Sequence, residues 1–387
     1  MTDRLLISNC KLFNSPGDTR PVSILTENGT ITKIGKIEKR DAKNILDAEG
    51  RIISPGFIDV HIQGAGGADV LDGTKKSLKT ISAACARFGT TGFLATTVFK
   101  PDKDNHHLKV AAENVDCELG GAHLLGIHLE GPFISMERRG MILQECISEP
   151  SLKFFNEIQK LVKGTLKIMT IAPELAGNLD IIRQLVNARI IASFGHSNAT
   201  YEETLKGFDA GISHVTHLFN AMPSLHHRAP GPLLAIFKMG GPSFQIIPDG
   251  VHLHPRVLKF VFEIIGMKRC VTITDGMRAM GLPDGIYIYN GKEYESKNGT
   301  ARYSDGTLIG TALGLIQMVL RLMEFSDCSL ETAIKTVTEN PARLLGIEDK
   351  KGSIAVGKDA DFVVLDHDYS VWSTIVNGKI VFQKLLL

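Results

Sequence analysis

The sequence lacks a net charge of either sign, because 43 lysines and arginines are balanced by 42 aspartates and glutamates, for a formal charge of +1. Nucleic acids and anionic membranes are usually recruited by a strongly positive field, so we expect neither kind of partner. The sequence also lacks any uninterrupted apolar run of about 18 residues, and its first ten residues lack the apolar stretch of a secretion signal. We therefore expect neither secretion nor membrane insertion.

Closely spaced cysteines are absent as well. No Cys-x-x-Cys pattern occurs, and the cysteines lie far apart at Cys10, Cys85, Cys117, Cys146, Cys270 and Cys328. This distribution suits buried thiols in a reducing compartment better than a disulfide framework or a zinc ribbon. We therefore expect a cytoplasmic protein.

The overall composition is that of a folded protein, with 43% hydrophobic and 22% charged residues over 387 positions. Disorder and fibrous repeats are thereby excluded. Both ends carry short apolar runs broken by Asn-Gly pairs, at 28–29 and at 377–378, which predict β-hairpins. We expect residues 1–54 and 355–387 to form one small β-sandwich domain together.

Between the two ends, short apolar runs alternate with longer stretches of helical periodicity, which is the pattern of repeated β-α units. Eight such runs occur, roughly 30 residues apart, and eight units are what a (β/α)8 barrel needs to close. The runs lie near residues 57, 92, 123, 166, 189, 211, 243 and 269. Residues 305–325 and 329–347 are predicted as two amphipathic helices. The sequence thus predicts an α/β fold with a TIM-like barrel over residues 55–354.

In such a barrel the active site forms where the strands end, so polar residues that close the apolar runs are candidates. These candidates are His61, Gln63, Glu130, His196, His217 and Asp275. Each alone has an ordinary structural explanation, but Glu130, His196 and His217 recur at three separate strand ends. We expect this trio to bind one metal ion with an open position for water. The other histidines near strand ends are expected to be structural: His123, His128, His214 and His254.

Several local motifs lie along most of the chain: PGFIDVHIQGAGGAD, HLEGP, GHSNA, THLFNAM, LHHRAPG, PDGVHLHP and TDGM. Near the C-terminus, NPARLLGI is followed by KGSIAVGKDADFVVLD. This C-terminal pair resembles the amidohydrolase superfamily in general, and the other motifs together resemble its N-acetylglucosamine-6-phosphate deacetylases. The resemblance implies hydrolysis of the acetyl amide of a phosphorylated amino sugar, in amino-sugar catabolism.

The resemblance also implies that Glu130, His196 and His217 hold the one divalent ion that the family keeps, with zinc expected and iron, manganese or cobalt as alternatives. Many superfamily members bind a second ion through a His-x-His pair, where this chain has His61 and Gln63. An amide oxygen is a weaker ligand than imidazole, so a second ion is expected to be weak or absent. The fourth run ends in IAPE, without the lysine that other branches carboxylate to bridge two ions.

For catalysis, the resemblance gives Asp275 the role of general base and then general acid. The substrate is expected to be bound by Asn220, Ala221, Arg228 and His252, with His227 as a further candidate. No Walker-type loop is present, so cationic side chains and backbone amides would hold the phosphate. In similar enzymes the arginine can come from a neighbouring subunit, and we therefore expect a homodimer.

Two segments depart from simple patterns. Many relatives have a carbonyl-polarising histidine where this chain has Ile142, and Gln144 is the nearby candidate to replace it. Without a replacement, losing one oxyanion donor is expected to cost on the order of a hundredfold in rate.

The glycine-rich segment 64–69 lacks the dinucleotide-binding GxGxxG pattern and is expected to be a loop that passes close to the metal centre.

Three other functions stay open from the sequence. An N-acetylgalactosamine-6-phosphate deacetylase would use the same metal, base and phosphate groups. An amidohydrolase acting on an unrelated amide would keep its activity without Arg228 and His252. A metal-free scaffold would have no need for ionisable groups at four strand ends, where leaving each one buried and unpaired is costly, and it would purify without metal.

Overall fold

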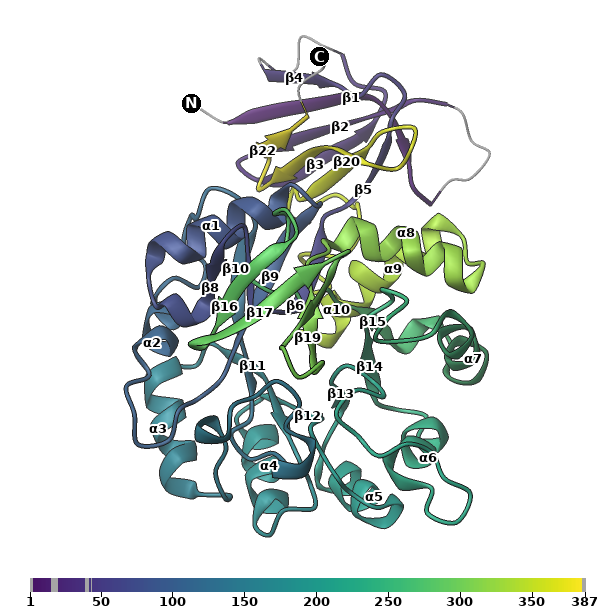
Figure 1. Ribbon diagram of the computed structural model, residues 1–387. Coiled ribbons are helices and arrows are strands. Elements are labelled where there is room, and N and C mark those ends of the chain that lie inside the picture. The colour runs from purple at the N-terminus through teal and green to yellow at the C-terminus, as the bar shows by residue number, and fades with distance from the viewer. Residues whose placement is uncertain (1–2, 15–19, 39–41, 43, 385–387) are drawn as a thin grey trace.

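The computed structural model describes residues 3–14, 20–38, 42 and 44–384, and its largest unit is a barrel of eight parallel strands (Figure 1). The strands are neighbours in chain order and span Phe57–Ile62 (β6), Thr90–Thr97 (β9), His123–Glu130 (β10), Leu166–Ile171 (β11), Ile191–Phe194 (β12), His214–Val215 (β13), Ser243–Ile246 (β14) and Cys270–Thr272 (β15). All eight predicted runs therefore contain a barrel strand. The barrel closes just past β15, where a parallel bridge joins Ile62 to Gly276 and the Asp275 amide donates to the His61 carbonyl at 3.1 Å.

Helices cover the outside of the barrel (Figure 1). They span Lys75–Ala86 (α1), His106–Glu113 (α2), Leu152–Val162 (α3), Asn178–Asn187 (α4), Tyr201–Ala210 (α5), Gly231–Lys238 (α6), Pro255–Ile265 (α7), Leu315–Ser326 (α8), Leu330–Val337 (α9) and Glu339–Leu344 (α10). Side chains that precede several helices accept from an amide of the first turn, which fixes where the helix begins. Thr200 does so for α5, as half of a capping box with Glu203. Within the described part of the chain, no helix combines the length and apolar character needed to cross a bilayer.

The two ends of the chain share a second sheet above the barrel (Figure 1). Its strands are Arg4–Leu12 (β1), Val22–Glu27 (β2), Thr30–Gly35 (β3), Asn44–Asp47 (β4), Ile52–Pro55 (β5), Phe362–Leu365 (β20), Val371–Val376 (β21) and Lys379–Gln383 (β22). β5 pairs antiparallel with β20, and Phe362 and Trp372 belong to a separate apolar core of this unit. The domain boundaries at residues 54 and 354 stay a prediction, and the outer limits 1 and 387 lie outside the described residues.

Both predicted Asn-Gly turns connect hairpins. Asn28 has φ +49° and Gly29 has φ +80° between β2 and β3, and the pair at 377–378 has φ +47° and +72° between β21 and β22. Two consecutive residues with positive φ match the right-handed twist of the flanking strands, which is why Asn and Gly are preferred there.

Residues 305–325 do not form the continuous helix that the sequence analysis predicts. A four-stranded antiparallel sheet is inserted between β15 and α8, with strands Gly285–Tyr289 (β16), Lys292–Lys297 (β17), Thr300–Arg302 (β18) and Leu308–Thr311 (β19). Gly306 and Gly310 have φ of +86° and +140°, which a helix does not use, and α8 begins only at Leu315. The second segment is split at Thr338 into α9 and α10, because Pro341 lies in the first turn of a new helix.

The glycine-rich segment 64–69 is not a loop but a short hairpin, Gly64–Ala65 (β7) with Ala68–Asp69 (β8). Gly66 and Gly67 form its turn with φ of +60° and +92°. A Cβ on Gly64 would lie 2.4 Å from the Ala68 carbonyl and 3.0 Å from the Arg278 amide. The close approach that glycine permits here is therefore to the opposite strand of the same hairpin and to the loop after β15, and not to the expected metal ligands.

Candidate active site

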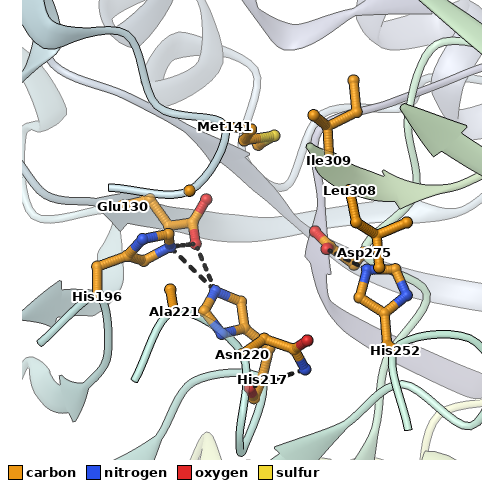
Figure 2. Close-up of a pocket in the computed structure, with 11 residues that line it drawn as sticks. Glu130, Met141, His196, His217, Asn220, Ala221, His252, Asp275, Leu308 and Ile309 are labelled. Carbon is orange, nitrogen blue, oxygen red and sulfur yellow. Dashed lines mark hydrogen bonds and ion pairs between the residues drawn. The ribbon is translucent and has the colours of Figure 1, made fainter. Parts of the chain in front are cut away.

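The C-terminal ends of the barrel strands surround a cavity of about 230 Å³. Its walls come from loops that follow five strands and from β19 (Figure 2). The lining residues are Glu130, Gly140, Met141, His196, His217, Asn220, Ala221, His252, Asp275, Leu308 and Ile309. Polar groups with acid-base and ligand chemistry thus share one small space with four apolar side chains.

The structure brings Glu130, His196 and His217 together at one end of this cavity (Figure 2). Oε1 of Glu130 lies 3.0 Å from Nε2 of His196 and 3.1 Å from Nε2 of His217, and the two Nε2 atoms are 3.0 Å apart. All three residues are at most 5% exposed. Among the described residues this is the one group of three or more such side chains with the spacing of metal ligands.

The donor set of this trio fits a divalent transition-metal ion. Ligand atoms held by one ion at about 2.0–2.2 Å lie about 3.0–3.5 Å from one another, close to the spacing seen here. Nδ1 of His196 lies 2.9 Å from the carbonyl oxygen of Arg138, which as an acceptor leaves the Nε2 lone pair free to ligate. Burial opposes ionisation of Glu130, but the charge of His61 and hydrogen bonds from His196 and His217 hold the pKa of Glu130 well below its usual range.

Three of the candidate side chains sit on left-handed backbone. His196 has φ +48°, His217 has φ +26° and Asp275 has φ +47°. This region costs a side-chain-bearing residue of order 1–3 kcal/mol, and it recurs at functional sites because the strain aims a side chain. Each of these three residues lies two or three positions past the end of its strand, where the turn in the backbone directs the side chain into the cavity.

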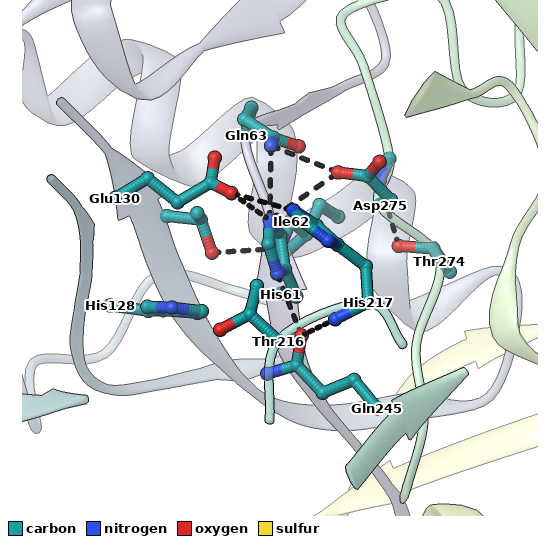
Figure 3. A network of polar contacts seen from close by, with 12 residues as sticks. His61, Ile62, Gln63, His128, Glu130, Thr216, His217, Gln245, Thr274 and Asp275 are labelled. Atoms are coloured by element: carbon teal, nitrogen blue, oxygen red, sulfur yellow. Dashed lines mark hydrogen bonds and ion pairs between the residues drawn. The ribbon is translucent and has the colours of Figure 1, made fainter. Parts of the chain in front are cut away.

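His61, Gln63 and Asp275 form a second polar cluster beside the trio (Figure 3). Nε2 of His61 lies 3.4 Å from Oδ1 of Asp275 and 3.6 Å from Oε1 of Glu130. Burial opposes protonation of His61, but the charges of Glu130 and Asp275 outweigh it and raise the pKa of His61 to about 9. The two carboxylates therefore favour a positive charge between them.

The amide nitrogen of Gln63, and not its oxygen, faces this cluster. It donates to Oδ1 of Asp275 at 3.0 Å and lies 3.2 Å from Nε2 of His61. The Oε1 atom is buried without a hydrogen-bond partner. A second ion at His61 and Gln63 would require the amide to rotate, because an amide nitrogen does not ligate.

His128 lies beneath His61, with the two rings edge to face and 4.6 Å between centroids. Its Nδ1 is 3.0 Å from the Val60 carbonyl and its Nε2 is 2.9 Å from Oγ1 of Thr170, so both ring nitrogens have partners. Burial is the main cause that lowers the pKa of His128 well below its usual value. A neutral ring that packs under His61 agrees with the structural role predicted for it.

The other histidines predicted to be structural do not line the cavity. His214 contacts Oγ of Ser243 at 2.7 Å, and His254 caps the start of α7. His123 opens β10, at the end of the strand opposite Glu130.

His252 and its partner Asp249 lie on the side of the cavity formed after β14. Nδ1 of His252 is 2.7 Å from Oδ2 of Asp249, and its Nε2 is 3.9 Å from Oδ2 of Asp275. Burial opposes ionisation of Asp249, but the hydrogen bond and charge of His252 lower the pKa of Asp249. His252 was predicted from the sequence and Asp249 was not, although the motif PDGVHLHP carries both at a spacing of three.

The phosphate-binding candidates divide into two groups. Asn220 and Ala221 line the cavity, whereas Arg228 and His227 are exposed and outside its lining. Nη1 of Arg228 lies 2.7 Å from Nε2 of His227. The chain therefore does not direct its own Arg228 into its own cavity.

Gln144 is also exposed and outside the cavity, and Ile142 is buried in a neighbouring apolar cluster. The structure thus does not bring Gln144 to the place of the expected histidine. Met141, Leu308 and Ile309 line the cavity instead, and none of the three was predicted from the sequence. No signal pointed to the last two, because their segment was predicted as part of a helix.

A closed (β/α)8 barrel with a buried Glu-His-His group and a further carboxylate at its strand ends is the architecture of barrel hydrolases. The sequence profile of the amidohydrolase family matches residues 52–381, and the chain belongs to this family, within its branch of N-acetylglucosamine-6-phosphate deacetylases.

Relatives and solved structures are similar over nearly the whole chain. The N-acetylglucosamine-6-phosphate deacetylase of Bacillus subtilis is 37% identical and covers 99% of this chain and 98% of its own length. The N-acetylgalactosamine-6-phosphate deacetylase of Escherichia coli O157:H7 is 32% identical, with coverage of 87% and 89%. An aspartate-to-alanine mutant of the Mycobacterium smegmatis N-acetyl-D-glucosamine-6-phosphate deacetylase, solved with N-acetyl-D-glucosamine-6-phosphate, superimposes with a TM-score of 0.88 at 30% identity, covering 98% of this chain and 99% of that one.

Proposed function

We propose that the protein hydrolyses N-acetyl-D-glucosamine 6-phosphate to D-glucosamine 6-phosphate and acetate in the cytoplasm. The observation that carries this proposal is the convergence of Glu130, His196 and His217 with Asp275 in one cavity. The names of the similar proteins support the substrate, since the deacetylases from Bacillus subtilis and Mycobacterium smegmatis are named for it.

In this proposal Glu130, His196 and His217 hold one divalent ion, most simply zinc. When bound, such an ion lowers the pKa of water and polarises the acetyl carbonyl. The same set of ligands also accepts iron, manganese or cobalt, so availability decides the native metal. A second ion at His61 and Gln63 would be weak or absent, because the Gln63 amide nitrogen faces that position.

Asp275 performs the proton transfers in this scheme. Its carboxylate takes a proton from the attacking water as the new carbon–oxygen bond forms. It returns that proton to the nitrogen as the carbon–nitrogen bond breaks, so that a neutral amine leaves and not an amide anion. The Gln63 amide donates to Oδ1 of Asp275 and so orients the carboxylate.

We further propose that the phosphate is bound by Asn220, Ala221 and His252 of one subunit and by Arg228 of a second copy in a homodimer. The exposure of Arg228, outside its own cavity, supports a role in a neighbouring site. A planar guanidinium suits a phosphate because it can form two parallel hydrogen bonds. His227, which contacts Arg228, would then help to orient it.

A second candidate substrate is N-acetyl-D-galactosamine 6-phosphate, because the similar Escherichia coli protein is named for that epimer. Acetate release from both epimers and from unphosphorylated N-acetylglucosamine tests the two candidates together, with bound metal counted on the same sample. We expect the gluco phosphate to be preferred and chelation to abolish the activity. Preference for the galacto epimer would select the second candidate, and cleavage of neither would overturn both.

The Asp275→Asn variant tests the proton transfers. We expect it to lose about a hundredfold to ten-thousandfold in kcat while retaining its metal, because an amide cannot accept the proton of water. Atomic absorption on the variant and the parent protein gives the metal content beside the rate. Full activity of Asp275→Asn would contradict the assigned role.

A further inference from the structure

Glu174 is a half-buried carboxylate that the scheme above does not use. It ends the IAPE motif directly after β11 and does not line the active-site cavity. Its Oε2 accepts from the Ser197 hydroxyl at 2.7 Å, and its Oε1 accepts from the Asn198 amide at 2.6 Å. Both donors directly follow His196, so the carboxylate holds the backbone next to a proposed metal ligand.

The segment 196–198 is also attached to two other loops of the site. The His196 carbonyl accepts from the Ser135 amide at 2.9 Å, in the loop that carries Arg138. The Ser197 amide donates to the Ala221 carbonyl at 3.2 Å, in the proposed phosphate loop. Ala221 itself has φ +53° and His196, next to Ser197, has φ +48°, so this contact joins two segments that each contain a residue with positive φ.

A strained backbone keeps its conformation only where several contacts determine it. On the side of Ser197 and Asn198, Glu174 supplies two charge-assisted hydrogen bonds. The Nε2 lone pair of a ligating histidine must point at the metal within a narrow range of angles. Residues that hydrogen-bond to the ligands, without touching the metal themselves, hold the ring in that orientation.

We propose that Glu174 is a positioning residue, which holds segment 196–198 so that His196 points into the metal site and the Ala221 backbone keeps its place in the phosphate loop. The inference rests on the metal site proposed above. The inference gives a role to the last residue of the IAPE motif, which was notable in the sequence only for the absence of a lysine.

The test compares Glu174→Gln with Asp180→Asn, a matched control. Both acids line the same surface groove, but Asp180 pairs with Arg183 at 2.7 Å and has no contact with segment 196–198. Glutamine keeps the size of Glu174 but removes its charge, so the two hydrogen bonds are no longer charge-assisted. We expect Glu174→Gln to bind zinc about 10- to 100-fold more weakly in competition with a chromophoric chelator, and Asp180→Asn to bind it like the parent protein.

A cobalt-substituted sample gives a second readout that does not depend on activity. We expect the visible d–d absorption to change in Glu174→Gln, because the His196 ring moves, and to stay unchanged in Asp180→Asn. Ser197→Ala removes one of the two bonds and should weaken zinc binding by less. The double variant with Glu174→Gln should lose less affinity than the sum of the two single losses, because both changes weaken the same contact.

The outcomes separate this inference from the proposed function. Unchanged zinc affinity and cobalt absorption in Glu174→Gln and Ser197→Ala would overturn it, even with a lower Tm. A parent protein that binds zinc without cleaving amino-sugar phosphates would overturn the substrate but leave this inference standing if the variants bind zinc more weakly. A parent protein that binds no metal would overturn both.

Discussion

His107 is a buried histidine of α2 that lies outside the candidate site. Its Nε2 is 2.8 Å from the Val98 carbonyl, at the end of the run that contains β9. Burial is the largest influence on the ring and lowers the pKa of His107 to about 4. An unfolded histidine has a pKa of about 6.5. Between pH 6.5 and 4 the unfolded chain therefore binds a proton at this position that the folded protein does not bind.

The stability that His107 contributes is therefore fully present above pH 6.5 and is lost as the pH falls from 6.5 toward 4. Between pH 7.5 and 5.5 the loss should be about 1.4 kcal/mol, since one pKa unit corresponds to that amount. Urea unfolding of the parent protein and of His107→Gln at the two pH values measures it, and the variant should lose less stability. His106→Gln, at the exposed neighbouring position, is the control; equal losses in all three proteins would contradict the prediction.

The residues of the candidate site could be predicted only in part. The strand-end positions of Glu130, His196 and His217 follow from sequence, because the carboxyl ends of parallel strands meet at one rim. The partners Asp249 and Glu174 could not be predicted in the same way, since a side chain's hydrogen-bond partner depends on how separate loops pack. The left-handed φ of His196 could not be predicted either, because positive φ is uncommon outside glycine even though histidine is enriched among the exceptions.

At the scale of elements, β19 directly supports the proposed general base. The Thr311 amide donates to the Asp275 carbonyl at 2.9 Å, and the Met277 amide donates back to the Thr311 carbonyl at 2.9 Å. Gly310 has φ +140°, and a Cβ there would lie 2.5 Å from the Asp275 carbonyl oxygen. The inserted sheet is thus packed against the backbone of Asp275 so closely that only glycine fits between them.

Gly310→Ala should therefore displace Asp275 and lower kcat by at least about tenfold, since a shift of about 1 Å at a reacting group can cost a hundredfold. Gly306→Ala is the matched control, because Gly306 also has a positive φ but a Cβ there would meet nothing within 4 Å. That control should lose about 1 kcal/mol of stability and keep its activity. Equal kcat values in the two variants would show that β19 does not position Asp275.

The barrel strands could be predicted because buried parallel strands are continuous apolar runs. The inserted sheet was missed although its turns carry the signal that located the other hairpins. Asn290-Gly291 joins β16 to β17 and Asn298-Gly299 joins β17 to β18, and all four residues have positive φ. Its strands alternate exposed and covered residues and belong to no β-α unit of the barrel. A search for repeated β-α units therefore does not find them.

At the scale of the whole molecule, the proposed dimer makes a quantitative prediction. The site would combine Asp275 of one subunit with Arg228 of another, so Asp275→Asn and Arg228→Ala, each nearly inactive, should complement each other in mixed dimers. Random exchange makes half of the dimers hybrids with one intact site, and the mixture should regain about a quarter of the parent activity.

Mixing Asp275→Asn with His252→Ala is the control for this experiment. Both residues line the same cavity of one chain, so no hybrid contains an intact site and no activity should return. Recovery in the control, or none in the test mixture, would show that Arg228 does not act across subunits.

The pairing of β5 with β20 has a consequence for synthesis on the ribosome. The first five strands emerge about 300 residues before β20, an interval on the order of 15 to 60 s at ordinary translation speeds. Throughout that time the nascent half-sheet has an open edge at β5, and the completed barrel offers it no partner strand. The newborn chain is therefore exposed to aggregation at this edge until β20 emerges, and chaperones that shield strand edges would act within that interval.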